Sequence, residues 1–415
     1  MIINNCFINT VCFNPSLEIL IMDDKKKILS AVAITHAFND ASVVIVPLLF
    51  PIFKNLFNLS YTEVGIITGG GLFITLIAEL LIGRLSDKKN RRTFLLFGTF
   101  LLGITFLFIP FAQGFLTLVI FVFLHRFAAS FFHPIGIAWI SKVFKKDRLD
   151  WAMGIQSALG DFGAFIAILT TPFIVEFKDW TYPFYVWAIM SVFCLLIFIY
   201  LTRNIIDKNT QGIKEKIKKK SIQVYLKEDW KDVKKTTLFL PGYIISGLAW
   251  SIIISYLPLL LDERTDLSLP FIGVIVSLWV GIGVIVCIFY GKIINRFGRK
   301  NVIILSYITI GFMGVFLSIF TNVLIIIIII VLLGIATFLS YPALFSFISE
   351  VTDENMEGKM FGYILSLELA GGAIILFLSG ITSDIWGIWT PFAILGALSF
   401  ITAFLLIIKR KNILI

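Results

Sequence analysis

Residues that carry charge or covalent chemistry are scarce in this chain. Only 15% of its 415 residues are charged, and it holds three histidines and four cysteines. The motifs GxxxxGK[ST], HExxH and GxSxG do not occur, which excludes the P-loop, zincin and serine-hydrolase patterns. The cysteines form no CxxC pair, so neither a disulfide framework nor a metal site is predicted. We therefore predict that the chain is not an enzyme and uses no cofactor.

Long polar segments are also nearly absent. Hydrophobic residues make up 58% of the chain, the mean hydropathy is +0.96, and soluble domains of this size are far less apolar. Because a spanning helix needs about 20 apolar residues, the sequence predicts an all-α integral membrane protein with twelve transmembrane helices in a lipid bilayer. We place them near residues 28–51, 61–83, 93–112, 115–142, 152–176, 182–202, 237–261, 269–291, 301–320, 322–349, 360–383 and 388–408.

Separated segments of the chain are related by one constant offset. The segment from Gly83 to Arg92 recurs 208 positions later, from Gly291 to Lys300. The same offset pairs Pro134 with Pro342, Ser141 with Ser349, Gly154 with Gly362 and Gly163 with Gly371. One register without gaps predicts two pseudo-symmetric six-helix bundles, residues 28–202 and 237–408.

Basic residues gather on one side of the predicted spans. Of 35 Lys and Arg residues, only Lys54, Lys178 and Arg264 lie on the other side, and Arg126 lies within a span. The positive-inside rule then predicts that both termini are cytoplasmic and that the protein resides in the plasma membrane. Topology alone accounts for these charges, so they indicate no nucleic-acid partner.

Three further segments lie outside the predicted bundles. Residues 1–27 and 409–415 are predicted to be cytoplasmic tails. The segment that begins at Met22 resembles the usual N-terminus of a membrane protein. We therefore interpret Met22 as the start of translation and residues 1–21 as an upstream misannotation. Residues 203–236 combine many basic residues with apolar ones at spacings of three to five. That pattern predicts a basic amphipathic helix on the anionic membrane surface or, alternatively, a solvated connector.

The loop after the second predicted span has a distinctive pattern that returns after the eighth. The matching residues are Gly83, Leu85, Asp87, Arg91 and Arg92 in the first copy and Gly291 and Arg299 in the second. In composition, repetition and position, these loops resemble the hallmark loop of the major facilitator superfamily. The resemblance covers roughly residues 28–408. It implies a twelve-helix transporter fold in which Asp87 and the arginines of the loop clasp the two halves on the cytoplasmic side. The second copy has Asn295 in place of an acid, so its clasp is expected to be weaker.

Two shorter patterns concern the kind of transporter. Arg126, in the fourth span, matches an arginine that many proton-coupled members of that superfamily have there. The Gly-Pro signature of drug–proton antiporters is missing from the fifth span. The segments from His36 to Asp40 and from Phe132 to Pro134 look like motifs of the fosmidomycin-resistance branch, which favours export.

Ionisable residues inside the predicted spans form the candidate site, because a charge in hydrocarbon costs a few kcal/mol and usually faces a cavity. They are His36, Asp40, Glu79, His125, Arg126, His133, Asp161 and Glu368. At about 1.5 Å per residue, a mid-membrane layer holds Asp40, Arg126, Asp161 and Glu368, and a layer nearer the cytoplasm holds His36 and His133. We predict that Asp40 and Asp161 pair with Arg126, and that the two histidines relay protons, for which a pKa near 6.5 is suited.

Some of these residues have structural alternatives. An Asp–Arg pair can simply lock a helix bundle. His125 points about 100° away from Arg126 on its helix, which favours a structural role. Glu79 lies one turn from Gly83 and can brace the loop. Glu368 is the acid deep in the second half, so it is assigned to contact with substrate or a coupling ion.

Together these patterns predict a proton-coupled secondary transporter that works by alternating access. Its expected partners are protons and a small organic solute, and it is expected to act as a monomer. Arg126 in an otherwise apolar cavity favours an anionic or amphiphilic solute, and export is the favoured direction. The alternatives are proton-coupled uptake of an organic anion or metabolite, a pump driven by a separate ATPase subunit, and a non-transporting membrane scaffold or receptor.

Overall fold

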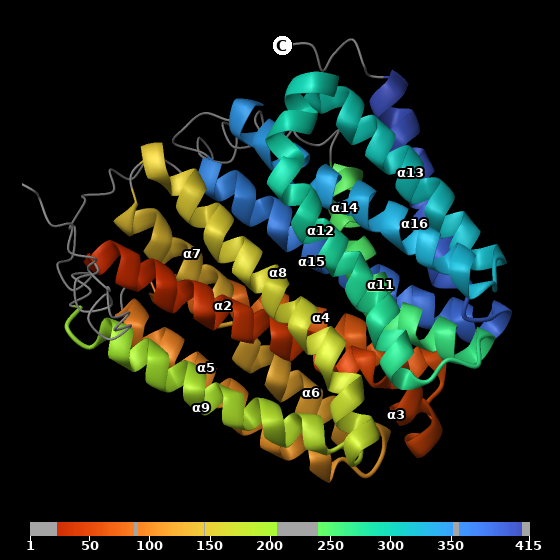
Figure 1. Ribbon diagram of the computed structural model, residues 1–415, viewed down its shortest axis with the longest axis horizontal. Helices are drawn as coiled ribbons and strands as arrows, with labels where there is room; N and C mark the ends of the chain where they lie inside the picture. Colours follow the sequence, from red (N-terminus) through yellow and green to blue (C-terminus); the bar gives the residue numbers. More distant parts are fainter. Residues whose placement is uncertain (1–22, 87–89, 145, 206–239, 352–356, 409–415) are drawn as a thin grey trace, which may run out of the picture.

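The protein folds into long helices that run roughly parallel or antiparallel to one another (Figure 1). A computed structural model describes residues 23–86, 90–144, 146–205, 240–351 and 357–408, and no strand occurs in these ranges. The helices of the first half are α2 (Asp24–Leu48), α3 (Phe50–Phe57), α4 (Tyr61–Ser86), α5 (Arg91–Phe108), the 3-10 turn η1 (Ile109–Phe111), α6 (Phe115–Ala129), α7 (Phe132–Val143), α8 (Lys146–Phe177) and α9 (Tyr182–Thr202). Those of the second half are α11 (Leu240–Arg264), α12 (Leu269–Phe297), α13 (Arg299–Ile319), α14 (Val323–Val351), α15 (Glu357–Trp386) and α16 (Thr390–Ile408).

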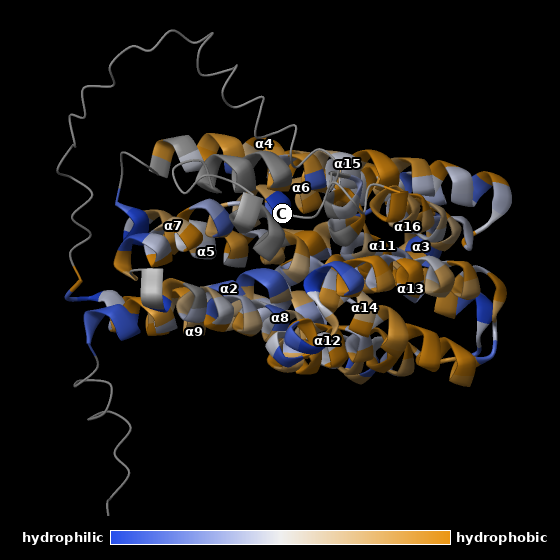
Figure 2. Ribbon diagram, turned by 90° about the horizontal axis from the view of Figure 1, so that it is seen from above, coloured by the Kyte–Doolittle hydropathy of each residue, from blue (hydrophilic) through white to orange (hydrophobic). Residues whose placement is uncertain are grey.

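The helix lengths and their surfaces fit a membrane. Eleven candidate spans in the described chain are long and apolar enough to cross a bilayer, and α11 occupies the place of the seventh predicted span. Large apolar side chains such as Phe73, Phe100 and Leu196 are exposed on the outside of the bundle, where lipid would cover them. Figure 2 shows hydrophobic residues along the helices and many hydrophilic ones near their ends. The predicted all-α membrane fold with two six-helix halves is confirmed.

Proline divides two of the predicted spans. The first span separates into α2 and α3 at Leu49, between Pro47 and Pro51. The fourth separates into α6 and α7 at Ser130 and Phe131. Pro134 lies in the first turn of α7, where the missing backbone N–H needs no helical acceptor. The sequence placed a single helix in each case, and the breaks reorient the side chains on either side of them.

The two halves touch through pairs of helices at one end of the bundle. We call the end where α2 begins and α16 ends the base, and the opposite end the apex. Near the apex, α4 and α15 meet backbone to backbone. A Cβ atom on Gly69 would lie 2.5 Å from the Ala373 carbonyl oxygen, and one on Gly65 would lie 3.0 Å from that of Leu376. Glycine is required here because a side chain would separate the two halves.

Polar contacts between the halves reinforce this closure at the apex. The Asp384 carboxylate on α15 accepts hydrogen bonds from the backbone N–H groups of Tyr61 and Thr62, both at 2.8 Å. A carboxylate at the start of α4 satisfies free N–H groups and favours the positive end of the helix dipole. The Tyr61 hydroxyl donates a hydrogen bond to Glu263 on α11. Each half therefore supplies groups to one apex clasp, which we define as Tyr61, Thr62, Glu263 and Asp384.

The predicted gating loop lies at the base. Asp87 is outside the described residues, and so is most of the predicted linker, residues 206–239. A Cβ atom on Gly83 would lie 3.5 Å from Pro134 in the same half. Arg91 begins α5 and is buried, and the Arg92 Nε atom donates to the Thr202 hydroxyl at 2.9 Å, tying α5 to α9. Of the second copy, Gly291 has open space around it and Arg299 begins α13. The clasping role of this loop stays a prediction.

Candidate functional site

Two histidines and an aspartate meet in the middle of the first half. His36 and Asp40 lie one turn apart on α2, with the His36 Nε2 atom 3.0 Å from Asp40 Oδ2. His133, on α7, brings its Nε2 atom to 4.0 Å from Asp40 Oδ1. The His36 and His133 rings stand edge to face at 5.4 Å, and Phe132 stacks on His36 at 4.4 Å. The two predicted layers are therefore joined, because Asp40 contacts both histidines.

A backbone carbonyl determines which nitrogen of His36 must hold a proton. The Nδ1 atom lies 2.8 Å from the carbonyl oxygen of Gln156 on α8. A carbonyl oxygen only accepts hydrogen bonds, so the hydrogen-bond network assigns a proton to Nδ1. In neutral His36 the Nε2 atom would then present a lone pair to the Asp40 carboxylate. The 3.0 Å separation is favourable only if one more proton is shared by Nε2 and Asp40.

The helix α8 approaches this pair closely because of a glycine. A Cβ atom on Gly160 would lie 2.7 Å from Asp40 Oδ2 and 2.7 Å from the Cε1 atom of His36. Asp161, the next residue, is near enough for its charge to act on Asp40 and His36, and also on Cys287 of the second half. Asp161 therefore adds a third carboxyl group to the neighbourhood of His36 and Asp40.

This packing gives a testable expectation for Gly160→Ala. The added methyl group must displace Asp40 or His36, which would lengthen a charge-assisted hydrogen bond worth about 1.5–3 kcal/mol. If this pair carries the proton coupling that the sequence predicts, transport should fall several-fold while the protein still folds. Gly154→Ala on the same helix is the matched control, because no neighbouring element among the described residues comes within 4 Å of its Cβ position. Equal transport by the two variants would contradict the expectation.

Arg126 does not form the ion pairs predicted for it. Among the residues that the structure describes, no carboxylate oxygen lies within 4.0 Å of its guanidinium group. Its acidic neighbours are Glu79 and, further along the site, Asp40, whose charges act on it without direct contact. Asp40 is already engaged by His36, and the charges that act on Asp161 are those of Asp40 and His36. The predicted Asp161–Arg126 pair is therefore not formed in this structure.

Glu368 is the charged group that the second half adds to this layer. It lies on α15, and its carboxyl carbon would be 2.8 Å from a Cβ atom on Gly247 of α11. The Oε2 atom is buried and has no hydrogen-bond partner among the described residues. Glu79 on α4, across the interface, is its acidic neighbour. A buried carboxylate oxygen without a partner is costly unless a ligand or proton satisfies it.

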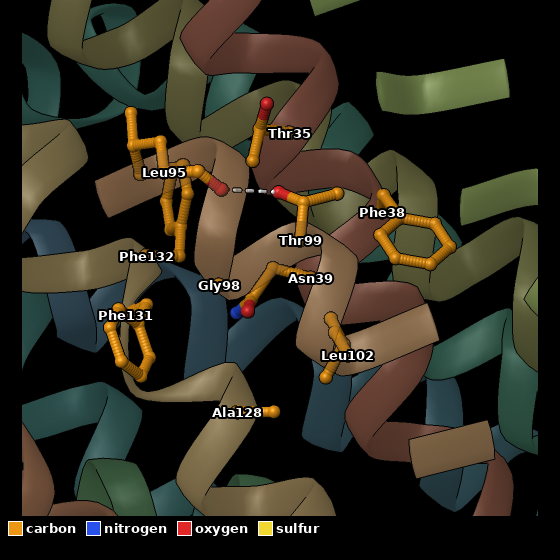
Figure 3. A pocket seen from close by; sticks show the side chains of 10 residues that line it. All are labelled: Thr35, Phe38, Asn39, Leu95, Gly98, Thr99, Leu102, Ala128, Phe131 and Phe132. Carbon is orange, nitrogen blue, oxygen red and sulfur yellow. Dashed lines mark hydrogen bonds between the residues drawn. The ribbon is translucent and has the colours of Figure 1, made fainter. Parts of the chain in front are cut away.

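Two other features near the site have structural explanations. His125 is buried, and its ring nitrogens contact the Thr105 hydroxyl at 2.9 Å and the Ser42 carbonyl at 3.2 Å. These bonds hold α6 against α5 and α2, as the sequence favoured. Asn39, which donates to Asp40 Oδ1 at 3.3 Å, lines a small pocket inside the first half (Figure 3). The other residues around that pocket come from the same half, so it is not a cavity between the halves.

The His36, Asp40 and His133 ligand atoms also lie within 4.8 Å of one another. Imidazole and carboxylate groups at that spacing are able to hold a divalent cation. The contact between His36 and Asp40 is, however, already a direct hydrogen bond. That geometry fits a shared proton without rearrangement.

Sequence comparison places this chain among transport proteins. The family described as Major Facilitator Superfamily matches residues 32–364 and, in a second match, residues 239–413. The MFS-type transporter YfnC of Bacillus subtilis is 28% identical over 150 residues, which is 36% of each chain. The match therefore spans only about a third of that relative. The MFS-type transporter MJ1560 of Methanocaldococcus jannaschii is 24% identical over 333 residues, covering 79% of this chain and 83% of the relative.

Solved structures share the fold at low sequence identity. The nucleoside transporter NupG has a TM-score of 0.72 at 14% identity, covering 94% of this chain and 100% of its own. A bacterial homologue of the human lysosomal transporter Spinster, in an inward-facing and unoccupied conformation, has a TM-score of 0.71 at 14% identity and covers 94% and 96%. These likenesses concern the fold alone. The finer resemblance to the fosmidomycin-resistance branch is not confirmed by these matches.

Proposed function

The chain belongs to the major facilitator superfamily and is a multi-pass membrane transporter, not an enzyme; from this premise we propose that it moves a small organic solute by alternating access coupled to protons. The observation that supports coupling best is the His36–Asp40 contact at 3.0 Å with Nδ1 fixed by the Gln156 carbonyl. In this arrangement the pair must hold a proton. His133 extends it by a second imidazole.

The arrangement of the halves favours alternating access, in which the His36–Asp40 pair is exposed to one side of the membrane at a time. Contacts between the halves are closest at the apex, through the apex clasp and the glycines of α4 and α15. At the base, no neighbouring element of the described chain comes within 4 Å of the Cβ positions of Gly154 and Gly291. If the base is cytoplasmic, as the positive-inside rule predicts, this conformation exposes the site to the cytoplasm. Rocking the halves would then expose it to the other side.

We propose export in exchange for protons, by a monomer of the plasma membrane with cytoplasmic termini. The His36–Asp40 and Phe132–Pro134 segments support export only through their resemblance to an efflux branch. Proton-coupled uptake uses the same residues with the gradient acting in the opposite sense. A scaffold or receptor without transport would need no proton at the His36–Asp40 pair.

Replacing Asp40 with asparagine is the direct test. The variant cannot share a proton with His36 as a carboxylate does. In liposomes containing a trapped pH dye, we expect solute-induced proton flux to fall at least about tenfold, while exchange of labelled for unlabelled solute persists. The solutes are a panel of amines, carboxylates and nucleosides.

Asp179→Asn provides a control of the same chemistry. Asp179 lies in the exposed loop between α8 and α9, and hydrogen bonds from the Thr181 hydroxyl and backbone N–H lower the pKa of its carboxyl. It is therefore ionised throughout the test range, and its replacement should leave flux unchanged. Full proton coupling in Asp40→Asn would refute the proposed role of the His36–Asp40 pair. Absence of both flux and exchange in the wild type would favour a non-transporting role.

A further inference from the structure

We propose that Glu368 and Trp250 form a binding subsite for the cationic group of the transported solute, so that the substrate class is an organic cation. This inference rests on the transport function proposed above. It differs from the sequence-based expectation of an anionic or amphiphilic solute. The argument depends on the charge balance of the interface between the halves, on the unsatisfied Glu368 oxygen, and on an aromatic side chain of the helix that packs against Glu368.

The middle of the protein has more acids than permanent cations. Asp40, Glu79, Asp161 and Glu368 contribute four carboxyl groups to it, whereas Arg126 contributes the permanent positive charge. Glu79 lies beside Arg126 and offsets its attraction for anions. Asp40 is satisfied by His36 and His133. This leaves Asp161 and Glu368, which form no ion pair among the described residues, and Glu368 is the one of the two that lies in the second half.

Packing holds the Glu368 carboxyl in a fixed position. The side chain lies against the backbone of α11 at Gly247, where its Cγ atom would be 2.5 Å from an added Cβ atom. No described group donates to Oε2, although that atom is buried. Removing a carboxylate from water without a partner is unfavourable by several kcal/mol. A ligand with a positive charge would satisfy it directly, and Glu79 from the opposite half adds negative potential.

An aromatic group stands on the same side of α11 as Gly247. Trp250 follows Gly247 by three residues, which places both on one helix face. Its ring lies 5.2 Å from that of Trp279 and 6.3 Å from that of Phe338, and it is only partly buried. Trp279 and Phe338 are themselves buried. Trp250 is thus on the face of α11 that packs against Glu368 at Gly247, and an indole and a carboxylate both attract an organic cation.

Paired ions of equal shape and opposite charge test this inference. Tetraphenylphosphonium and tetraphenylborate differ mainly in charge sign, and benzylamine supplies a small primary ammonium. We would measure saturable binding of each to the purified full-length protein in detergent, without a proton gradient. Saturable binding is expected for at least one of the two cations and not for tetraphenylborate.

Variants then locate the binding site. Glu368→Gln should weaken cation binding at least about tenfold, and Trp250→Leu should weaken it about fivefold or more. Glu368→Asp keeps the charge and should retain part of the affinity. Glu176→Gln, at an exposed position of α8, is the matched control and should bind as the wild type does. Size-exclusion profiles would check that each variant is folded.

The outcomes separate this inference from the proposed function. Cation binding that is unchanged in Glu368→Gln, or saturable binding of tetraphenylborate alone, would overturn the subsite. So would the absence of saturable binding of both cations. If cations bind through Glu368 but Asp40→Asn still couples protons fully, the proton proposal fails and the cation subsite stands.

Discussion

Replacing Gly163 with valine is expected to prevent the first half from folding. Gly163 lies on α8, where a Cβ atom would overlap the Ala37 carbonyl oxygen and lie 2.6 Å from the Ala37 Cα atom on α2. These are backbone atoms and cannot rotate away. Overpacking of a core commonly costs about 1–3 kcal/mol, and separating α8 from α2 would also displace Gln156 from His36. We expect a destabilisation of at least about 3 kcal/mol, seen as little monodisperse protein and a lower apparent Tm.

The control for this variant lies on the same helix. Gly154→Val makes the same chemical change at a position with no atom within 4 Å of the Cβ site. Its yield and thermal stability should remain close to those of the wild type. If Gly163→Val were as stable as Gly154→Val, the close α2–α8 contact described above would be wrong. Gly163→Ala should lie between the two.

The second large effect is expected from Gly380→Leu, which should hold the apex open. A Cβ atom on Gly380 would lie 3.0 Å from Thr62 Cα and 3.1 Å from Gly65 Cα, across the interface of the halves. A leucine there would push α15 away from α4 and remove the Asp384 carboxylate from the start of α4. We expect transport to be lost although the protein folds, because each half keeps its own core.

Distances between spin labels would report this change. One label replaces Asn55, an exposed residue of α3, and the other replaces Asp266, after α11, in a background without other reactive cysteines. In the parent the distance distribution should be dominated by the closed apex, and in Gly380→Leu it should shift to longer values. Gly387→Ala is not a suitable control, because Gly387 has a φ of 107°. Gly372→Ala on α15 is suitable, since its nearest neighbour would be the flexible end of Leu72 at 3.4 Å. An unchanged distribution in Gly380→Leu would refute the closing role of this glycine.

Hydropathy was sufficient to predict the helices but not where they break. The sixth span was placed at 182–202 and the structure has α9 at Tyr182–Thr202, because a long apolar run between polar residues has few alternatives in a membrane. The breaks at Leu49 and at Ser130 depend on how neighbouring helices satisfy the backbone freed near a proline. A single sequence does not contain that information. Pro47 and Pro134 were the signals that a break was possible.

The depth of each candidate residue along its helix could be calculated from the sequence, which grouped these residues into layers. Their hydrogen-bond and ion-pair partners could not be predicted in this way. Asp40 was predicted to pair with Arg126, whereas His36, one turn away on the same helix, engages it at 3.0 Å. The i, i+4 spacing that put both on one face was the signal for this pair. The Gln156 carbonyl could not have been found, because any backbone oxygen of α8 would look the same in sequence. The sequence also gave no signal for the contact between Asp384 and α4. An acidic residue at the end of a membrane span is common, so Asp384 did not stand out.

The contact between Asp384 and the first turn of α4 has a consequence for hydration. Opening of the apex breaks the hydrogen bonds from the Tyr61 and Thr62 N–H groups to the Asp384 carboxylate. Each of these groups must then form hydrogen bonds to water instead. The resting conformation should therefore respond to water activity. Sucrose or another osmolyte, being excluded from newly hydrated surface, should bias the protein toward the closed apex and slow each cycle without touching the transport site.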